Sequence, residues 1–281
     1  MKTKILKLIA LAAASTFALA ACTQPTEPAG KNGASAAKTS GTVTLVVGAS
    51  PTPHSEILKF VKDNLAKDAG LDLQIKEYTD YVQPNVALDA GELDANFFQH
   101  IPYFDKEVST KGYKFEHGAG IHIEPIGIYS TSVKDLKAVP EGGTVVIPND
   151  ATNGGRALKL LEAQKLLTIK AGVDNPTKAD IVANPKKLNI VESDAAAVPI
   201  QYADAALGVI NSNFALENGL NPSKDALAIE PGVNNPYSNI LAWNKNSKKL
   251  EAVKKLDKLL HTPEVAKFIK DNFKGVVFPA F

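Results

Sequence analysis

Apolar residues along most of the chain recur with the spacing of strands and helices in turn. From Thr42 onward, short runs such as 43–48 (VTLVVG) and 205–210 (AALGVI) are almost wholly apolar, which indicates buried strands. Segments between such runs space apolar residues three or four apart, as amphipathic helices do. Short strands that alternate with helices predict an α/β fold with a mostly parallel sheet.

The predicted elements fall into two series. The first comprises strands over 43–48, 71–78 and 93–97, helices over 54–67, 82–90 and 101–111, and an extended segment over 121–129. The second comprises strands over 144–147, 188–191, 205–210 and 239–243, helices over 152–166 and 198–203, and two C-terminal helices over 248–261 and 263–274. Two series favour two lobes over one long sheet. We expect crossings between the lobes near 129–133 and 235–239, with the C-terminal helices packed on the first lobe.

The N-terminal residues follow a different pattern. Three lysines within the first seven residues precede an apolar run over 8–20, and small residues then lead to Cys22, the only cysteine. This order is typical of a signal peptide over 1–21, and the run is short for a membrane span, which needs about 20 apolar residues. The sequence Leu-Ala-Ala-Cys also resembles a bacterial lipobox, which predicts lipidation of Cys22. The alternative is a plain cleavage site with an incidental cysteine.

Composition and the absence of catalytic motifs exclude several classes of function. Residues 22–41 lack apolar periodicity and are rich in small and polar residues, which predicts a flexible lipidated tether. Removing residues 1–21 would leave a net charge of −2, so there is no basic excess for nucleic acid. No nucleophile elbow, P-loop or dinucleotide fingerprint is present. His122 and Glu124 share a strand face, but no helical H-E-x-x-H motif accompanies them. We therefore expect no enzyme, no metal site and no cofactor.

One side chain stands apart by its type. Arg156 is the single arginine among thirty lysines, and it follows Asn153-Gly154-Gly155 in the first turn of a predicted helix. A guanidinium matches a carboxylate as a planar fork, which a lysine does not. A helix N-terminus adds free N–H groups and the positive end of the helix dipole. This pattern predicts a carboxylate site, against the alternative of a surface arginine on a capped helix.

Aromatic and amide side chains supply further candidates near the ends of predicted strands. The segment 96–103 (NFFQHIPY) follows one strand, and ligands of α/β sheets bind beyond the carboxyl ends of strands. Aromatic faces suit an apolar or thioether group, although core packing is the alternative. Asn211 follows another strand and Asn239 follows the turn 234–238. An amide both donates and accepts, as an amino-acid backbone requires, although turn residues are also commonly asparagine.

Longer motifs together resemble those of the NlpA family of lipoproteins, the methionine-binding proteins of ABC importers (MetQ type). They are the segments 78–85 (YTDYVQPN), 91–100 (GELDANFFQH) followed by Pro102-Tyr103, 147–153 (IPNDATN) followed by Gly155-Arg156, 209–211 (VIN) and 236–239 (PYSN). The resemblance runs from about residue 42 to the C-terminus. It implies a two-lobed periplasmic-binding-protein fold, type 2-like, that closes on a small ligand in the cleft between the lobes.

The resemblance also implies roles for particular residues. Arg156 would clamp the ligand carboxylate, and Asn211 and Asn239 would bind its amino and carboxylate groups. The side chains that would enclose the thioether are Tyr81, Phe98, His100 and Tyr103. Adjacent strand residues point to opposite faces, so only one of Phe97 and Phe98 would face the ligand; the resemblance implies Phe98, with Phe97 as the alternative. Thr152 and Asn153 would add contacts at the helix start.

The expected protein is thus a monomeric, lipid-anchored binding protein that captures methionine and delivers it to a membrane ABC importer of permease and ATPase. Residues 1–21 are the signal peptide, 22–41 the tether, 42–129 and 240–281 lobe I, and 130–239 lobe II. The alternatives are another amino acid or a methionine-containing dipeptide as ligand, or a surface adhesion lipoprotein. The expected location is the bacterial cell envelope, on the periplasmic side of a membrane. Thr23 rather than Asp follows Cys22, so the outer membrane or cell surface remains an alternative.

Overall fold

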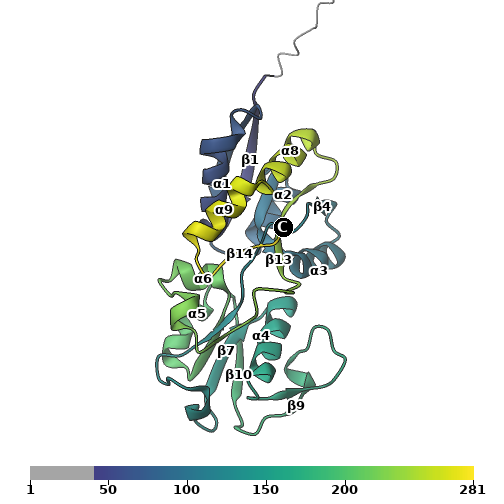
Figure 1. Cartoon of the computed structure of the whole chain (residues 1–281). Helices are drawn as coiled ribbons and strands as arrows, with labels where there is room; N and C mark the ends of the chain where they lie inside the picture. Colours follow the sequence, from purple (N-terminus) through teal and green to yellow (C-terminus); the bar gives the residue numbers. More distant parts are fainter. Residues whose placement is uncertain (1–40) are drawn as a thin grey trace, which may run out of the picture. The chain divides into compact units, whose positions relative to one another are not determined.

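The computed structural model describes residues 41–281, and within them the chain forms two lobes, each built on its own sheet (Figure 1). The predicted signal peptide, the lipidation at Cys22 and nearly all of the predicted tether lie outside the described residues. Among the helices of 41–281, none combines the length and apolar character needed to cross a membrane. We call the part that holds the first sheet lobe I and the part that holds the second sheet lobe II.

The sheet of lobe I is mixed. Its strands run in the order β14-β5-β13-β3-β1-β2, with β4 also paired to β13. Strand β1 is parallel to β2 and β3, whereas β13 is antiparallel to β3, β4 and β5. The strands are β1 (Val43–Ala49), β2 (Leu71–Glu77), β3 (Ala95–His100), β4 (Phe115–His117), β5 (His122–Ile123), β13 (Ser238–Asn244) and β14 (Phe278–Pro279).

The sheet of lobe II runs in the order β10-β7-β11-β6-β12. Strand β7 is parallel to both of its neighbours, and β6 is antiparallel to β11 and β12. The strands are β6 (Gly127–Tyr129), β7 (Thr144–Pro148), β10 (Asn189–Ser193), β11 (Leu207–Ile210) and β12 (Ala228–Ile229). A separate pair, β8 (Thr168–Ile169) and β9 (Ile181–Ala183), is antiparallel. The predicted parallel pairing is therefore present around β1 and β7, and antiparallel strands flank it.

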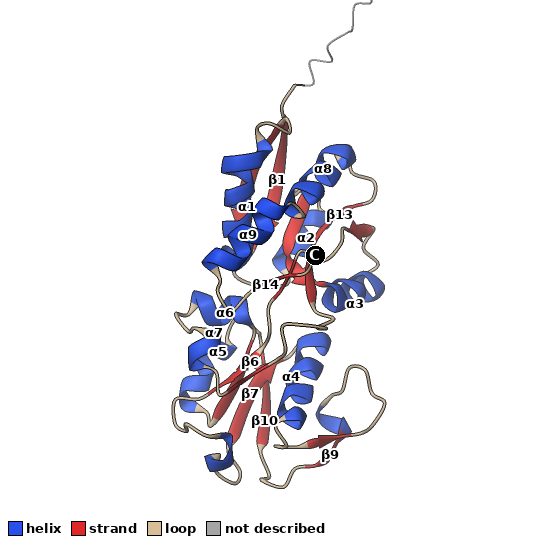
Figure 2. Ribbon diagram, viewed as in Figure 1, coloured by secondary structure: helices blue, strands red, loops and turns tan. Residues whose placement is uncertain are grey.

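Helices cover both faces of each sheet (Figure 2). In lobe I they are α1 (Glu56–Val61, between the helical turns Pro51–Ser55 and Lys62–Ala66), α2 (Gln83–Asp89), α3 (Ile101–Lys111), α8 (Leu250–Leu260) and α9 (Pro263–Asn272). In lobe II they are α4 (Ala151–Ala163), α5 (Val198–Gln201), α6 (Ser212–Glu217) and α7 (Pro222–Asp225), with short 3-10 turns at Leu136–Ala138, Lys178–Asp180 and Tyr202–Asp204.

The alternation of apolar side chains along each strand divides the core between these faces. In β1, Leu45 and Val47 are fully buried against α1, α8 and α9, while Val46 packs on the opposite side near α2. In β7, Val145 faces the cluster under α4, and Val146 faces α5 and α6. The C-terminal helices thus complete the core of lobe I, as predicted.

The first crossing between the sheets lies earlier than predicted. Residues 127–129, which the sequence analysis placed in lobe I, pair as β6 in the sheet of lobe II. The crossing is therefore 124–126, where Pro125 lacks the N–H needed to continue strand pairing. The second crossing is 230–237, between β12 and β13, close to its predicted place.

Strand β3 also differs from its prediction. It covers Ala95–His100 rather than 93–97, because β13 pairs with it as far as the register Asn239↔His100. Phe98 and His100 therefore lie on the strand itself, at its carboxyl end, and not in a loop beyond it.

Candidate ligand-binding site

A small, partly open cavity lies where residues from both lobes meet the two crossings. All seven side chains predicted to bind ligand line it. The complete lining is Tyr81, Phe98, Gln99, His100, Tyr103, Glu124, Asn153, Arg156, Asn211, Ser212, Asn213 and Asn239.

The start of α4 places Arg156 in this cavity. The Asp150 side chain caps the helix by accepting from the N–H groups of Thr152 and Asn153. Gly154 lets the first turn lie directly on the end of β7, since an added Cβ would stand 2.8 Å from the Pro148 carbonyl oxygen. Arg156 then extends from the next turn of α4 and is only 3% exposed.

We expect Gly154→Ala to destabilise the protein, although alanine is normally the better helix former by about 1 kcal/mol. The methyl group would push α4 away from the backbone of β7, and overpacking of this kind costs about 1–3 kcal/mol. Urea denaturation should show a lower midpoint. Gly41→Ala is the matched control, because nothing lies within 4 Å of its added Cβ. An unchanged midpoint in Gly154→Ala would show that α4 does not depend on this close approach.

Glu230, in the second crossing, holds one edge of the Arg156 guanidinium. Nε lies 3.0 and 2.9 Å from the two Glu230 carboxylate oxygens, and Nη2 lies 2.7 Å from Oε2. Nη2 also donates to the Glu124 carbonyl oxygen at 2.8 Å. Among the described residues, none accepts a hydrogen bond from Nη1. The Nε and Nη2 groups of Arg156 are thus already bonded within the protein. Of the guanidinium nitrogens, Nη1 is the one that remains to donate to a ligand in the cavity.

Hydrogen bonds across the cavity join the two lobes through Asn153. Its Oδ1 lies 3.1 Å from His100 Nε2 in lobe I, and it accepts from Asn211 Nδ2 at 2.9 Å. His100 Nδ1 accepts from the Tyr103 N–H, so Nε2 carries the proton and donates to Asn153. Burial, and then the nearby charge of Arg156, lowers the pKa of His100 to about 3, which keeps the ring neutral. Asn211 Oδ1 is buried and has no partner among the described residues.

Three aromatic rings form the apolar part of the lining. Tyr81 lies 6.1 Å from Phe98 and 5.9 Å from Tyr103, measured between ring centroids. The Tyr81 hydroxyl donates to Asn213 Oδ1 across the lobes, and the Tyr103 hydroxyl donates to the Tyr81 carbonyl oxygen. Phe97 points the other way into the core of lobe I, as the alternation along β3 requires. The two tyrosine rings are therefore held in place by hydrogen bonds from their hydroxyl groups.

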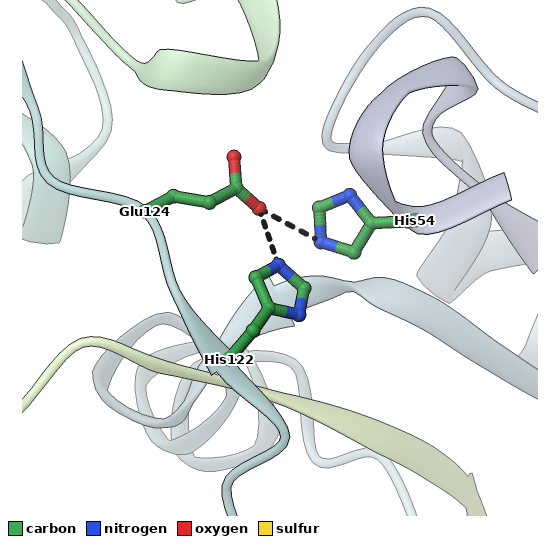
Figure 3. Close-up of side chains that lie close together, drawn as sticks. All are labelled: His54, His122 and Glu124. Carbon is green, nitrogen blue, oxygen red and sulfur yellow. Dashed lines mark hydrogen bonds and ion pairs between the residues drawn. The ribbon is translucent and has the colours of Figure 1, made fainter. Parts of the chain in front are cut away.

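Glu124, in the first crossing, is a buried carboxylate that sequence reasoning did not select for the cavity. Its Oε1 lies 2.7 Å from His122 Nε2 and 3.2 Å from His54 Nε2, and both rings point toward it (Figure 3). Burial raises the pKa of Glu124, while His54 and Arg156 oppose that rise. Burial lowers the pKa of His54 to about 4 and of His122 to about 3, so both rings are neutral near pH 7. The polar face expected for His122 and Glu124 is in fact interior.

His54, His122 and Glu124 are close enough to be considered as metal ligands. A histidine that binds a metal normally donates from its other ring nitrogen to an outer acceptor. Here Nδ1 of both His54 and His122 is buried without a partner among the described residues. The distance of 2.7 Å from His122 Nε2 to Glu124 Oε1 is that of a hydrogen bond. The donor set therefore fits a hydrogen-bonded cluster and not a metal centre.

Sequence reasoning missed residues that act through long-range contacts. Glu230 also accepts from the Ile126 N–H and from Asn235, so it connects both crossings to Arg156. Tyr237 stacks its ring 4.1 Å from the Arg156 guanidinium carbon. The one local signal was Glu124 itself, a lone acid among apolar residues in 121–129.

Comparison with known proteins agrees with this geometry. A family model described as NlpA lipoprotein matches residues 45–281. The chain belongs to the NlpA lipoprotein family. A relative from Bacillus subtilis, named methionine-binding lipoprotein MetQ, is 39% identical over 245 residues, which are 85% of this chain and 89% of that protein.

Two further proteins are similar to this NlpA-family chain over most of its length. The structure of a nutrient binding protein from Burkholderia cenocepacia bound to methionine is 44% identical, with a TM-score of 0.80, and covers 84% of this chain and 100% of that one. The two-lobed α/β fold is thereby confirmed. Outer membrane lipoprotein 3 from Mannheimia haemolytica is 35% identical over 98% of both chains. The relatives described here are named as lipoproteins or binding proteins.

Proposed function

We propose that this protein is a lipid-anchored substrate-binding protein that captures methionine between its lobes and delivers it to an ABC importer. The observation that carries the proposal is the set of polar groups left unpaired around one small cavity. Arg156 Nη1 is a charged donor without an acceptor among the described residues, and Asn211 Oδ1 is a buried acceptor without a donor. Buried polar groups are normally paired, so these atoms indicate a ligand with both an anionic and a donating group.

A free amino acid satisfies both groups at once. Its carboxylate would accept from Arg156 Nη1 and from Asn239 Nδ2, which donates to none of the described residues. Its ammonium would donate to Asn211 Oδ1 and to the Glu124 carboxylate. Pairing with Glu124 also supplies the counter-charge that a buried ammonium requires. A single amino acid carries both charged groups on one Cα, whereas a dipeptide would separate its two charged ends further.

The aromatic part of the cavity supports methionine as that amino acid. Tyr81, Phe98 and Tyr103 would surround the ligand side chain, and sulfur–aromatic contacts stabilise by about 0.3–1.5 kcal/mol. The names of the Bacillus subtilis and Burkholderia cenocepacia relatives point to the same ligand.

Delivery to an importer would use the two lobes and the anchor together. A ligand that contacts Arg156 in lobe II and Asn239 in lobe I favours the closed arrangement of the lobes. Acyl chains on Cys22 would keep the loaded protein beside a membrane permease and its ATPase, which raises its effective concentration there. The Mannheimia haemolytica relative is named for the outer membrane, so that membrane is a further candidate for the anchor.

The test is to identify the ligand directly. We expect denaturation of the freshly purified protein to release methionine. Mass spectrometry should detect the released methionine in about stoichiometric amount. Calorimetry on protein refolded without ligand should then show tight binding of methionine and much weaker binding of methioninol, which lacks the carboxylate, and of 4-(methylthio)butanoate, which lacks the ammonium. Norleucine, which replaces sulfur by CH₂, tests the aromatic contacts. Absence of methionine binding in a folded, ligand-free sample would overturn the proposal.

A further inference from the structure

We propose that His54 is a positioning residue that fixes the amide of Asn239, so that its NH₂ group and not its oxygen faces the ligand carboxylate. The inference rests on the proposed function in one respect, namely that the ligand carries a carboxylate. His54 lies in the turn that joins β1 to α1 and does not line the cavity. It would therefore act on the ligand only through its neighbours.

His54 contacts the first crossing and the beginning of β13, the strand that follows the second crossing. Its Nε2 lies 3.0 Å from Asn239 Oδ1, at the start of β13, and 3.2 Å from Glu124 Oε1, in the first crossing. The ring is 1% exposed and packs edge-on against Phe97 and His122. One imidazole nitrogen thus contacts a residue of the first crossing and a residue of the strand that follows the second crossing.

The neighbours of Nε2 determine where the proton lies. An ionised carboxylate only accepts hydrogen bonds, so Nε2 must carry a proton in order to face Glu124 Oε1. The Asn239 atom beside a proton-bearing Nε2 must then be the amide oxygen. Nδ1 is the bare nitrogen, since it is buried without a partner among the described residues. The lowered pKa of His54 agrees with a neutral ring that has one N–H.

This orientation matters because the two ends of an amide have nearly the same shape and opposite hydrogen-bonding character. With Oδ1 held by His54, Asn239 presents Nδ2 to the cavity beside Arg156. If the amide turned over, its oxygen would face the ligand carboxylate, and two acceptors would repel each other. His122 provides the contrast, because its Nε2 contacts Glu124 and no bond to Asn239 is formed.

The first experiment measures the proton directly in the unmodified protein. Long-range ¹H–¹⁵N NMR correlations distinguish the two tautomers of a neutral histidine, and they can be recorded with and without methionine. We expect His54 to be the Nε2–H tautomer in both states. The Nδ1–H tautomer would overturn the proposal, because Nε2 could not then donate to Asn239. This result does not depend on which ligand the protein binds.

The second experiment compares two substitutions of nearly equal shape. His54→Gln keeps an N–H near the position of Nε2, whereas His54→Met does not. We expect methionine affinity within about threefold of wild type for His54→Gln and at least about tenfold weaker for His54→Met. Methioninol, which has no carboxylate, should bind the two variants about equally. Equal methionine affinity of the two folded variants would overturn the proposal.

A double-mutant cycle separates an effect through Asn239 from a general loss of packing. If His54 acts through Asn239, adding His54→Met to Asn239→Ala should weaken binding by less than about threefold further. Tyr81→Phe is the control, because the Tyr81 hydroxyl bonds Asn213 and not Asn239, so its effect should multiply with that of Asn239→Ala. Full multiplication for His54→Met would also overturn the proposal. If His54→Met fails to fold, the tautomer measurement still decides. Loss of methionine binding by wild type would instead refute the proposed function.

Discussion

Replacing Arg156 by lysine should weaken methionine binding by about 100-fold or more. Arg156 uses Nε and Nη2 for Glu230 and for the Glu124 carbonyl oxygen, which leaves Nη1 for the ligand. A lysine ammonium is a single point and cannot serve Glu230 and the ligand carboxylate together. Hydrogen bonds to charged groups contribute about 1.5–3 kcal/mol each, and about 1.4 kcal/mol corresponds to tenfold in affinity. Isothermal calorimetry of the ligand-free variant measures the effect.

The double variant Arg156→Lys with Glu230→Gln shows whether stability or recognition is lost. Glu230 is nearly buried, so leaving its charge without the full guanidinium contact destabilises the fold. Removing that charge should restore much of the unfolding free energy and little of the methionine affinity. Lys159→Arg is the control, since Lys159 lies on the same helix and bonds an exposed carbonyl. Methionine affinity near wild type in Arg156→Lys would remove Arg156 from the site.

Local pattern was sufficient for the elements that bury one continuous face. Strands β1, β2 and β7 and helices α3 and α4 lie close to their predicted ranges because their apolar spacing extends over several residues. Strands β8, β12 and β14 have two residues each, which is too short to carry a period. Their pairing is set by the residues they meet in the folded chain. The first crossing was predicted too late in the chain for the same reason, since the pairing of 127–129 depends on β11 and β12.

The residues in and around the cavity also fall into two groups. Some have a local sequence signal, and the others do not. Arg156 was identifiable as the single arginine at a helix start, and Phe98, His100 and Tyr103 follow from one motif. Glu230 is separated from Arg156 by 74 positions, and His54 from Asn239 by 185. No spacing rule relates residues so far apart in sequence. The contacts that Glu230 makes with Arg156, and His54 with Asn239, become apparent only in the folded chain.

Glu124→Gln should reduce methionine affinity by about 10- to 100-fold, because the ligand ammonium would lose its counter-charge. Glutamine keeps an Oε1 that can still accept from His54 and His122, so the substitution removes charge with little change of shape. Calorimetry at pH 7 measures the loss. Native-like affinity would place the ammonium elsewhere in the cavity.

Stability of the empty protein should respond to Glu124→Gln in the opposite direction. Burial raises the pKa of Glu124, so the folded chain holds this proton more firmly than the unfolded chain. Its ionised form therefore lowers the unfolding free energy as pH rises from the usual pKa, 4.5, through the raised one. We expect Glu124→Gln to be at least as stable as wild type near pH 7. The Glu124 charge thus lowers the stability of the empty protein and is paired with an ammonium only when the ligand binds. Retaining such a charge is consistent with a binding function.

The pH dependence of methionine affinity provides the final test of this charge. Affinity should be highest above the raised pKa of Glu124 and should fall as pH is lowered through it, and Glu124→Gln should remove that fall. His54 and His122, with pKa values of about 4 and 3, stay neutral over most of this range. Glu217 also titrates nearby, because burial raises its pKa to about 7, so Glu217→Gln is the control. If the loss of methionine affinity at low pH persists in Glu124→Gln and disappears in Glu217→Gln, the pH dependence is due to Glu217.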